Sequence, residues 1–172
     1  MRLLFEMDTK NYDVNGCVFV RNSARCINIK NGLVAMVHSL KYDYYKFPGG
    51  GIEQGESVEN ALIRETLEET GLVVIPESVK EYGCVHRIQK DDVGVADIFV
   101  QDNFYYFCDV EENVRLQNLD GYEAEEKFTL EYVQPHKAIL ANRNKKHDSI
   151  DKIMNERDAK VLELLIKEGY FH

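Results

Sequence analysis

A glycine-rich segment, FPGGGIEQGES, runs from Phe47 to Ser57, and an acidic segment, VENALIRETLEETGL, follows it from Val58 to Leu72. The acidic segment has the end signals of a helix. Ser57 can accept a backbone N–H as an N-cap, and Gly71 can end the helix in a left-handed turn. The sequence therefore predicts a loop followed by a helix, and we call residues 47–57 the glycine loop.

Three glutamates recur along this helix at spacings of three and four residues, namely Glu65, Glu68 and Glu69. Residues at those spacings lie about 5–6 Å apart on one side of a helix. Like charges at that separation repel by roughly 3 kcal/mol per pair at an effective dielectric constant near 20. A divalent ion would reverse this repulsion, because clustered oxygen ligands suit hard cations such as Mg2+ or Mn2+. A solvated helix face is the alternative explanation.

The two segments together resemble the signature of the Nudix hydrolases, G-x5-E-x7-R-E-U-x-E-E-x-G-U, in which U is a bulky aliphatic residue. Its positions are filled here by Gly50, Glu56, Arg64, Glu65, Glu68, Glu69, Gly71 and Leu72. Thr66 departs from the signature, because it stands where an aliphatic residue is usual. Its methyl group can still pack, so we expect a small stability cost.

The resemblance implies an α/β fold, the Nudix-type α/β/α sandwich with a mixed β-sheet and a loop–helix–loop catalytic motif. The chain has 172 residues, 44% of them hydrophobic, which fits one domain with a sizeable core. We expect a single Nudix hydrolase domain over residues 1–172. A C-terminal helix over about 149–168 should pack on it, with Asp148 or Ser149 as its cap.

The resemblance also implies an enzyme, a Nudix-type pyrophosphohydrolase. Its reaction would be the Mg2+-dependent (or Mn2+-dependent) hydrolysis of a phosphoanhydride bond in a nucleoside diphosphate linked to another moiety. The expected metal ligands are the carbonyl of Gly49 and the carboxylates of Glu65, Glu68 and Glu69. A non-catalytic nucleotide-binding sensor with the same fold is the alternative function.

The expected catalytic residues are Glu65, Glu68, Arg64 and Glu126. Arg64 would orient Glu56 and Glu65, since a guanidinium fork can hold two carboxylates. The proton acceptor would be Glu65 or a carboxylate from the acidic loop over residues 119–127, where Glu123, Glu125 and Glu126 are candidates. Solvated loop acids are the alternative for most of these.

The expected substrate contacts are Tyr44, Tyr45, Glu53 and Glu56. The tyrosines directly precede the glycine loop, so their rings could stack on a nucleobase. They could equally cover the edge of the core. Glu53 could lie in the outer shell of the metal site or face solvent.

The formal net charge of −9 disfavours a nucleic-acid surface, which needs cationic side chains to neutralise phosphates. A small nucleotide-type molecule is therefore the expected partner. No apolar run is long enough for a membrane span, and the start of the chain does not read as a secretory signal. The scattered cysteines, Cys17, Cys26, Cys84 and Cys108, favour buried thiols in the cytoplasm. A homodimer stays open, because dimers are common in the family.

The rest of the chain alternates between strand and helix patterns. The pair Asn31-Gly32 between two β-rich runs predicts a hairpin with a type I′ turn. Further strands are expected at about 12–20, 72–75, 81–88, 98–110 and 128–133. A short helix should begin near Pro135.

Overall fold

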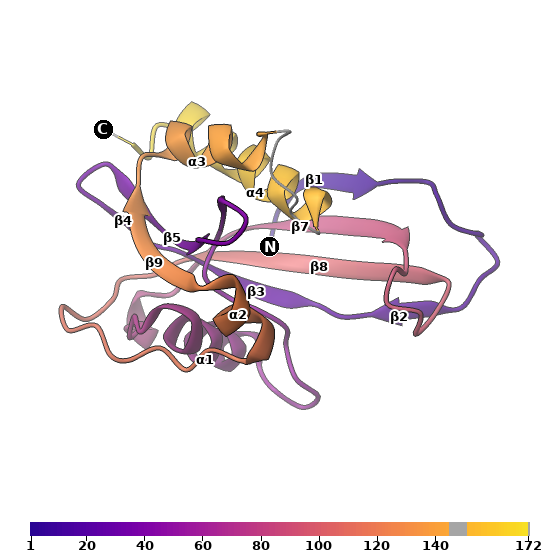
Figure 1. Cartoon of the computed structure of the whole chain (residues 1–172), viewed down its shortest axis with the longest axis horizontal. Coiled ribbons are helices and arrows are strands. Elements are labelled where there is room, and N and C mark those ends of the chain that lie inside the picture. The colour runs from indigo at the N-terminus through magenta and orange to yellow at the C-terminus, as the bar shows by residue number, and fades with distance from the viewer. Residues whose placement is uncertain (145–150, 172) are drawn as a thin grey trace.

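The computed structural model describes residues 1–144 and 151–171. Helices lie on both sides of its β-sheets (Figure 1). The helix α1 (Val58–Thr70) lies on one side, and α3 (Pro135–Asn142) and α4 (Lys152–Lys167) lie together on the other. This arrangement confirms the expected α/β/α sandwich.

The first sheet mixes parallel and antiparallel strands, as expected. Its centre is the antiparallel pair of β7 (Lys80–Lys90) and β8 (Ile98–Phe107). The strand β1 (Leu3–Asp8) joins β7 in parallel. On the other side, β2 (Val18–Val20) and then β3 (Ser23–Ile27) pair in parallel with successive parts of β8. The backbone N–H groups of Ala24 and Cys26 in β3 donate to the carbonyls of Gly50 and Pro48, so β3 holds the glycine loop beside this sheet.

The second sheet is antiparallel. The strand β5 (Leu33–Ser39) pairs with β4 (Ile29–Lys30), β6 (Tyr44–Lys46) and β9 (Phe128–Val133). The strand β6 leads directly into the glycine loop, so this sheet sets where the loop begins.

The hairpin between β4 and β5 confirms the prediction from Asn31-Gly32. Both residues have positive φ, 53° and 73°, as a type I′ turn requires.

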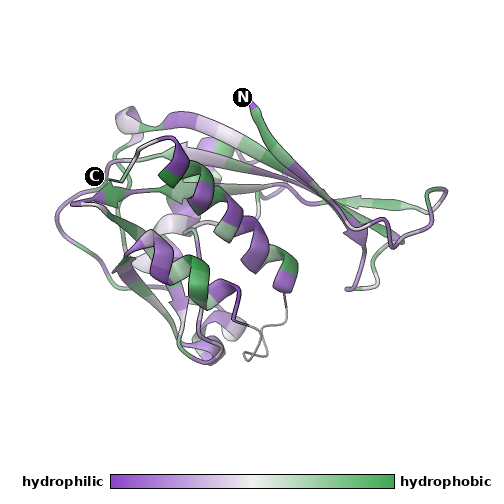
Figure 2. Cartoon of the chain, turned by 90° about the horizontal axis from the view of Figure 1, so that it is seen from above, coloured by the Kyte–Doolittle hydropathy of each residue, from purple (hydrophilic) through white to green (hydrophobic). Residues whose placement is uncertain are grey.

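Side chains on β3 alternate between the two faces of its sheet, as in any strand. Ala24 and Cys26 pack with Ala61 and Leu62 of α1. Ile27 belongs to the larger core cluster below α3 and α4, together with Val34, Met36, Tyr45, Phe47, Tyr105, Leu162 and Leu165. Figure 2 shows α3 and α4 side by side above the sheets, each with hydrophobic and hydrophilic residues alternating along it.

Several predicted elements differ from the structure. The strand expected at 12–20 is reduced to β2, and β1 was not expected. Only an isolated bridge between Val74 and Val110 forms where a strand over 72–75 was predicted, so that prediction was wrong. The acidic loop over 119–127 contains a short helix, α2 (Gly121–Glu126), in which Asp120 and Glu123 form a capping box.

The C-terminal helix is capped by Asp151, whose side chain accepts the backbone N–H of Met154 at 2.7 Å. The expected caps, Asp148 and Ser149, lie outside the described residues. Further along α4, Asp158 is buried and accepts the backbone N–H of Phe47 at 3.1 Å and the hydroxyl of Tyr105 at 2.9 Å. The helix is therefore attached to the residue that opens the glycine loop.

Among the described residues, no helix is both long enough and apolar enough to cross a bilayer. Cys26, Cys84 and Cys108 are buried free thiols, as predicted. Cys17 is exposed instead, and its thiol donates to Asp97 at 3.0 Å.

Candidate active site

The ends of α1 confirm the predicted end signals. The hydroxyl oxygen of Ser57 accepts the N–H of Asn60 at 3.1 Å. At the other end Gly71 adopts φ 75° and donates to the carbonyl of Leu67 at 2.8 Å. The departing residue, Thr66, is fully buried, and its hydroxyl oxygen has no hydrogen-bond partner within the described part of the chain. Burial of an unpaired hydroxyl is unfavourable, so a stability cost at this position stays a prediction.

Two glycines allow the glycine loop to lie directly against its neighbours. Gly49 has φ +132°, and a Cβ added there would overlap the carbonyl oxygen of Ala24 in β3. A Cβ added at Gly50 would overlap the carboxylate of Glu65 instead. The loop is thus pressed between β3 and α1, and a side chain at position 50 would occupy the space in which the Glu65 carboxylate lies.

Arg64 joins three carboxylates. Its Nε and one terminal nitrogen donate to the two oxygens of Glu56, at 2.8 and 2.9 Å. The other terminal nitrogen donates to Glu65 at 2.8 Å and to Glu68 at 3.2 Å. These bonds lower the pKa of Glu56 below its ordinary value. The guanidinium therefore lies where an orienting group for Glu56 and Glu65 was expected.

Glu69 has a different environment from the other acids of α1. Its side chain is 1% exposed and pairs with the buried ammonium of Lys46. Its second oxygen accepts the N–H of Gly49 at 2.9 Å. Burial raises the pKa of Glu69, whereas the charges of Lys46 and Arg25 oppose that rise. Both oxygens of this predicted metal ligand are thus bound within the protein.

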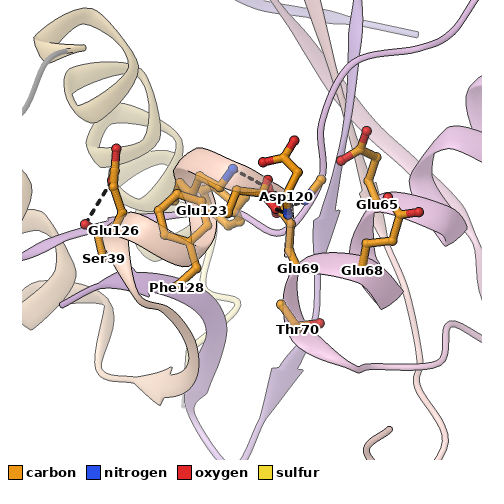
Figure 3. A network of polar contacts seen from close by, with 12 residues as sticks. Ser39, Glu65, Glu68, Glu69, Thr70, Asp120, Glu123, Glu126 and Phe128 are labelled. Atoms are coloured by element: carbon orange, nitrogen blue, oxygen red, sulfur yellow. Dashed lines mark hydrogen bonds and ion pairs between the residues drawn. The ribbon is translucent and has the colours of Figure 1, made fainter. Parts of the chain in front are cut away.

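The three acids do not share one face as the spacing suggested. Figure 3 shows Glu65 and Glu68 next to each other, with Glu69 set apart toward Glu123 of α2. Consecutive helical residues point about 100° apart, so Glu68 and Glu69 diverge. Glu68 reaches the solvent, with 36% of its side chain exposed, while Glu69 enters the protein.

The acids of α2 also separate. Glu123 is buried, and accepts the N–H of Asp120 at 3.1 Å on the side nearer α1. Glu126 instead accepts the hydroxyls of Ser39 at 3.0 Å and Tyr44 at 2.7 Å (Figure 3). Glu125 pairs with Lys41 at 2.5 Å. Glu123 rather than Glu126 therefore lies near the acids of α1 (Figure 3).

The predicted substrate residues fall in two places. Tyr44 and Tyr45 are 5% and 1% exposed, and Tyr45 stacks on His38 with 4.2 Å between ring centroids. Both rings therefore belong to the core, which was the alternative interpretation, and neither offers a free face to a base. Glu53 is exposed and donates its N–H to Glu56 at 3.0 Å.

An open groove of about 780 Å³ lies beside the glycine loop, on the face of the sheet that α1 covers. Its polar lining includes Arg21, Asn22 and Glu53. Its apolar lining comes from both sheet and helix: Phe19, Val20, Ile52, Val58 and Phe104. Of the predicted substrate residues, Glu53 is the one that borders it.

Glu65 and Glu68 fit a divalent ion by the chemistry of their donor atoms. Each gives one oxygen to Arg64, and the other oxygen of each has no hydrogen-bond or ion-pair partner among residues 1–144 and 151–171. Carboxylate oxygens are the ligands that Mg2+ and Mn2+ prefer. These two residues could hold such an ion without breaking an internal hydrogen bond.

Sequence reasoning missed two residues that contact the predicted ligands, Lys46 and Arg25. Lys46 bonds Glu69, and Arg25 donates to the carbonyl of Gly49. Each is a charged residue next to apolar strand residues, and that pattern was the available signal. Their partners are 23 and 24 positions away, so pairing could not be inferred from spacing.

A family model for the NUDIX domain matches residues 16–155 of the chain. An RNA pyrophosphohydrolase of Campylobacter jejuni is 38% identical over 73 residues, which cover 42% of this chain and 45% of that protein. A Bacillus subtilis protein, provisionally named an 8-oxo-dGTP diphosphatase, is 40% identical over 67 residues, covering 39% of this chain and 37% of that protein. The match thus spans less than half the length of these curated relatives.

Solved structures share the architecture. The E. coli ORF135 protein superposes with a TM-score of 0.58 and 15% identity, over 88% of this chain and 94% of that one. A NUDIX hydrolase from Nitrosomonas europaea superposes with a TM-score of 0.52 and 14% identity, over 83% and 90%. At such identities the likeness shows the fold alone.

Proposed function

The chain belongs to the Nudix family, and from that membership we propose that it hydrolyses a phosphoanhydride bond in a nucleoside diphosphate linked to another group, with Mg2+ or Mn2+ as cofactor. One observation carries the proposal. Glu65 and Glu68 lie together on α1, joined by Arg64, and each keeps one carboxylate oxygen available.

In the proposed reaction, Glu65 and Glu68 hold the metal ion. A divalent ion held by these two carboxylates would supply positive charge at the diphosphate and would lower the pKa of the attacking water. Arg64 fixes the directions of both carboxylates through its planar fork. The proton of the water goes to Glu65 or to a carboxylate of the acidic loop over residues 119–127. Glu126 is a weaker candidate, since two hydroxyls already occupy its carboxylate.

The group linked to the diphosphate determines which compound is the substrate. By their names, one relative acts on RNA and the other on 8-oxo-dGTP, a free nucleotide. The net charge of −9 opposes long contact with an RNA chain. We therefore favour a small nucleotide as the substrate.

The test is a substrate panel with Mg2+ or Mn2+, containing 8-oxo-dGTP, ADP-ribose, a dinucleoside polyphosphate and a short 5′-triphosphorylated RNA. Release of phosphate, pyrophosphate or nucleoside monophosphate should identify a substrate. Glu68→Gln should then lower kcat/KM at least about 100-fold, because the metal ion would lose an anionic ligand.

Glu59→Gln is the matched control, since Glu59 is an exposed glutamate in the first turn of the same helix. It should leave kcat/KM unchanged. Binding of a nucleotide without hydrolysis of any panel member would contradict the proposal and favour the non-catalytic sensor.

A further inference from the structure

Two buried cations, Lys46 and Arg25, contact Glu69 and Gly49, the two predicted metal ligands other than Glu65 and Glu68. Lys46, at the end of β6, is 4% exposed and binds a carboxylate oxygen of Glu69. Arg25, in β3, is 6% exposed and donates to the carbonyl oxygen of Gly49. Both predicted ligands, Gly49 and Glu69, therefore already have a cationic partner supplied by the chain.

The environment of Lys46 holds it in this position. Its ammonium lies 4.8 Å from the ring centroid of Phe128, on which a cation is favourably placed. The other oxygen of Glu69 is held by the Gly49 N–H. An ion at Glu69 would have to displace the ammonium into an apolar environment, where an unpaired charge is costly.

Arg25 likewise disfavours a metal ion, in this case at the carbonyl of Gly49. One terminal nitrogen reaches the Gly49 carbonyl, and its positive charge acts on Glu69 as well. Its Nε is buried and has no hydrogen-bond partner in the part of the chain that the structure describes. A divalent ion at the Gly49 carbonyl would lie against this guanidinium, and like charges repel.

We propose that Lys46 and Arg25 act as built-in cations at Glu69 and at the Gly49 carbonyl, so that Glu65 and Glu68 hold the divalent ion without Glu69. The inference rests on the proposed function and deepens it. It makes Lys46 a positioning residue, because it acts by fixing Glu69 and thereby the glycine loop.

Mn2+ binding to the whole chain tests the inference without any substrate. Free Mn2+ is measured by electron paramagnetic resonance as the ion is titrated into wild-type protein and into variants. Glu68→Gln should weaken Mn2+ binding at least about tenfold, the scale of effects seen when a metal site loses a supporting group. Glu69→Gln should leave the dissociation constant unchanged, as should the control Glu59→Gln.

The double variant Lys46→Met/Glu69→Gln removes both buried charges at once, so it avoids an unpaired charge in the interior. It should bind one Mn2+ with wild-type affinity. Lys46→Met alone should bind a second Mn2+, because the Glu69 carboxylate would be released. If that single variant does not fold, as judged by circular dichroism, the double variant decides the question.

The possible failures are distinguishable. Loss of Mn2+ binding in Glu69→Gln, to the same extent as in Glu68→Gln, would overturn this inference and leave the proposed function intact. Wild-type protein that binds no Mn2+ at all would overturn both. Two ions bound per wild-type chain, one of them lost in Glu69→Gln, would also overturn the inference.

Discussion

Two adjacent glutamates on α1, Glu68 and Glu69, lie in different environments. Glu68 belongs to a partly exposed group around Arg64, in which the side chains are between 14% and 36% exposed. Glu69 belongs to a buried group with Lys46, in which the side chains are 1% and 5% exposed. The same residue type at consecutive positions thus takes part in two kinds of ion pair.

The difference matters because the two kinds have different physical properties. A partly exposed carboxylate can exchange its partner, since water compensates either state and the pair itself contributes little. A buried carboxylate cannot, because removal of its partner leaves an uncompensated charge. The exposed group is therefore suited to binding a metal ion reversibly, and the buried group to holding the glycine loop in place.

The largest expected effect comes from breaking the buried pair. Lys46→Met should lower the free energy of unfolding by about 3–5 kcal/mol, because Glu69 would be left as an unpaired buried acid. Urea denaturation followed by circular dichroism measures the change. Lys41→Met is the matched control, since Lys41 pairs with Glu125 at the surface, and it should cost less than about 1 kcal/mol. Equal effects in the two variants would contradict the distinction.

Gly49 and Gly50 of the glycine loop differ in the same way, because one contacts rigid backbone and the other a flexible side chain. Gly49→Ala should destabilise by about 2–4 kcal/mol, because φ is +132° and the added Cβ would meet the rigid backbone of Ala24. Gly50→Ala should cost only about 1 kcal/mol, since the group it meets is the flexible end of Glu65. Thermal unfolding compares the two variants. Gly50→Ala should nevertheless weaken Mn2+ binding, because Glu65 must move, and unchanged binding would contradict the placement of Glu65 in the site.

The smallest effect is a pH dependence of the exposed group. Arg64 lowers the folded-state pKa of Glu56 below 4.5, so the pair stabilises the fold above about pH 4.5. That contribution is lost as the pH falls through the folded-state pKa. Glu56→Gln should therefore make stability less dependent on pH in this acidic range, as measured by urea denaturation at a series of pH values. A slope equal to that of wild type would show that Arg64 does not stabilise the charged form.

Local signals were sufficient where the deciding contacts are close in the sequence. Ser57 caps α1 through Asn60, Asn31-Gly32 makes its turn, and β9 has the predicted bounds. The apolar residues of 72–75 carry the same β-prone signal, yet they form only one bridge, to Val110, flanked by backbone hydrogen bonds from Ile75 to Asp109 and from Glu111 to Val73. The strand β1 escaped prediction because it depends on pairing with β7, about eighty residues later.

The candidate site shows the same limit. The signature predicted the residues that Arg64 joins, because they lie within one loop and one helix. Helical spacing alone placed Glu69 in one group with Glu65 and Glu68. Only the tertiary structure shows that the ammonium of Lys46 binds the Glu69 carboxylate. Glu123 was one of three candidates in the acidic loop, and the choice among them depends on a six-residue helix, α2, which local sequence signals did not predict.

The bond between Phe47 and Asp158 has a consequence for how the protein is made. The amide is synthesised 111 residues before the carboxylate that accepts its hydrogen bond. During translation, at about 5–20 residues per second, the glycine loop emerges from the ribosome several seconds ahead of that acceptor. The loop can form its turn early, but its final anchorage waits until Asp158 has emerged.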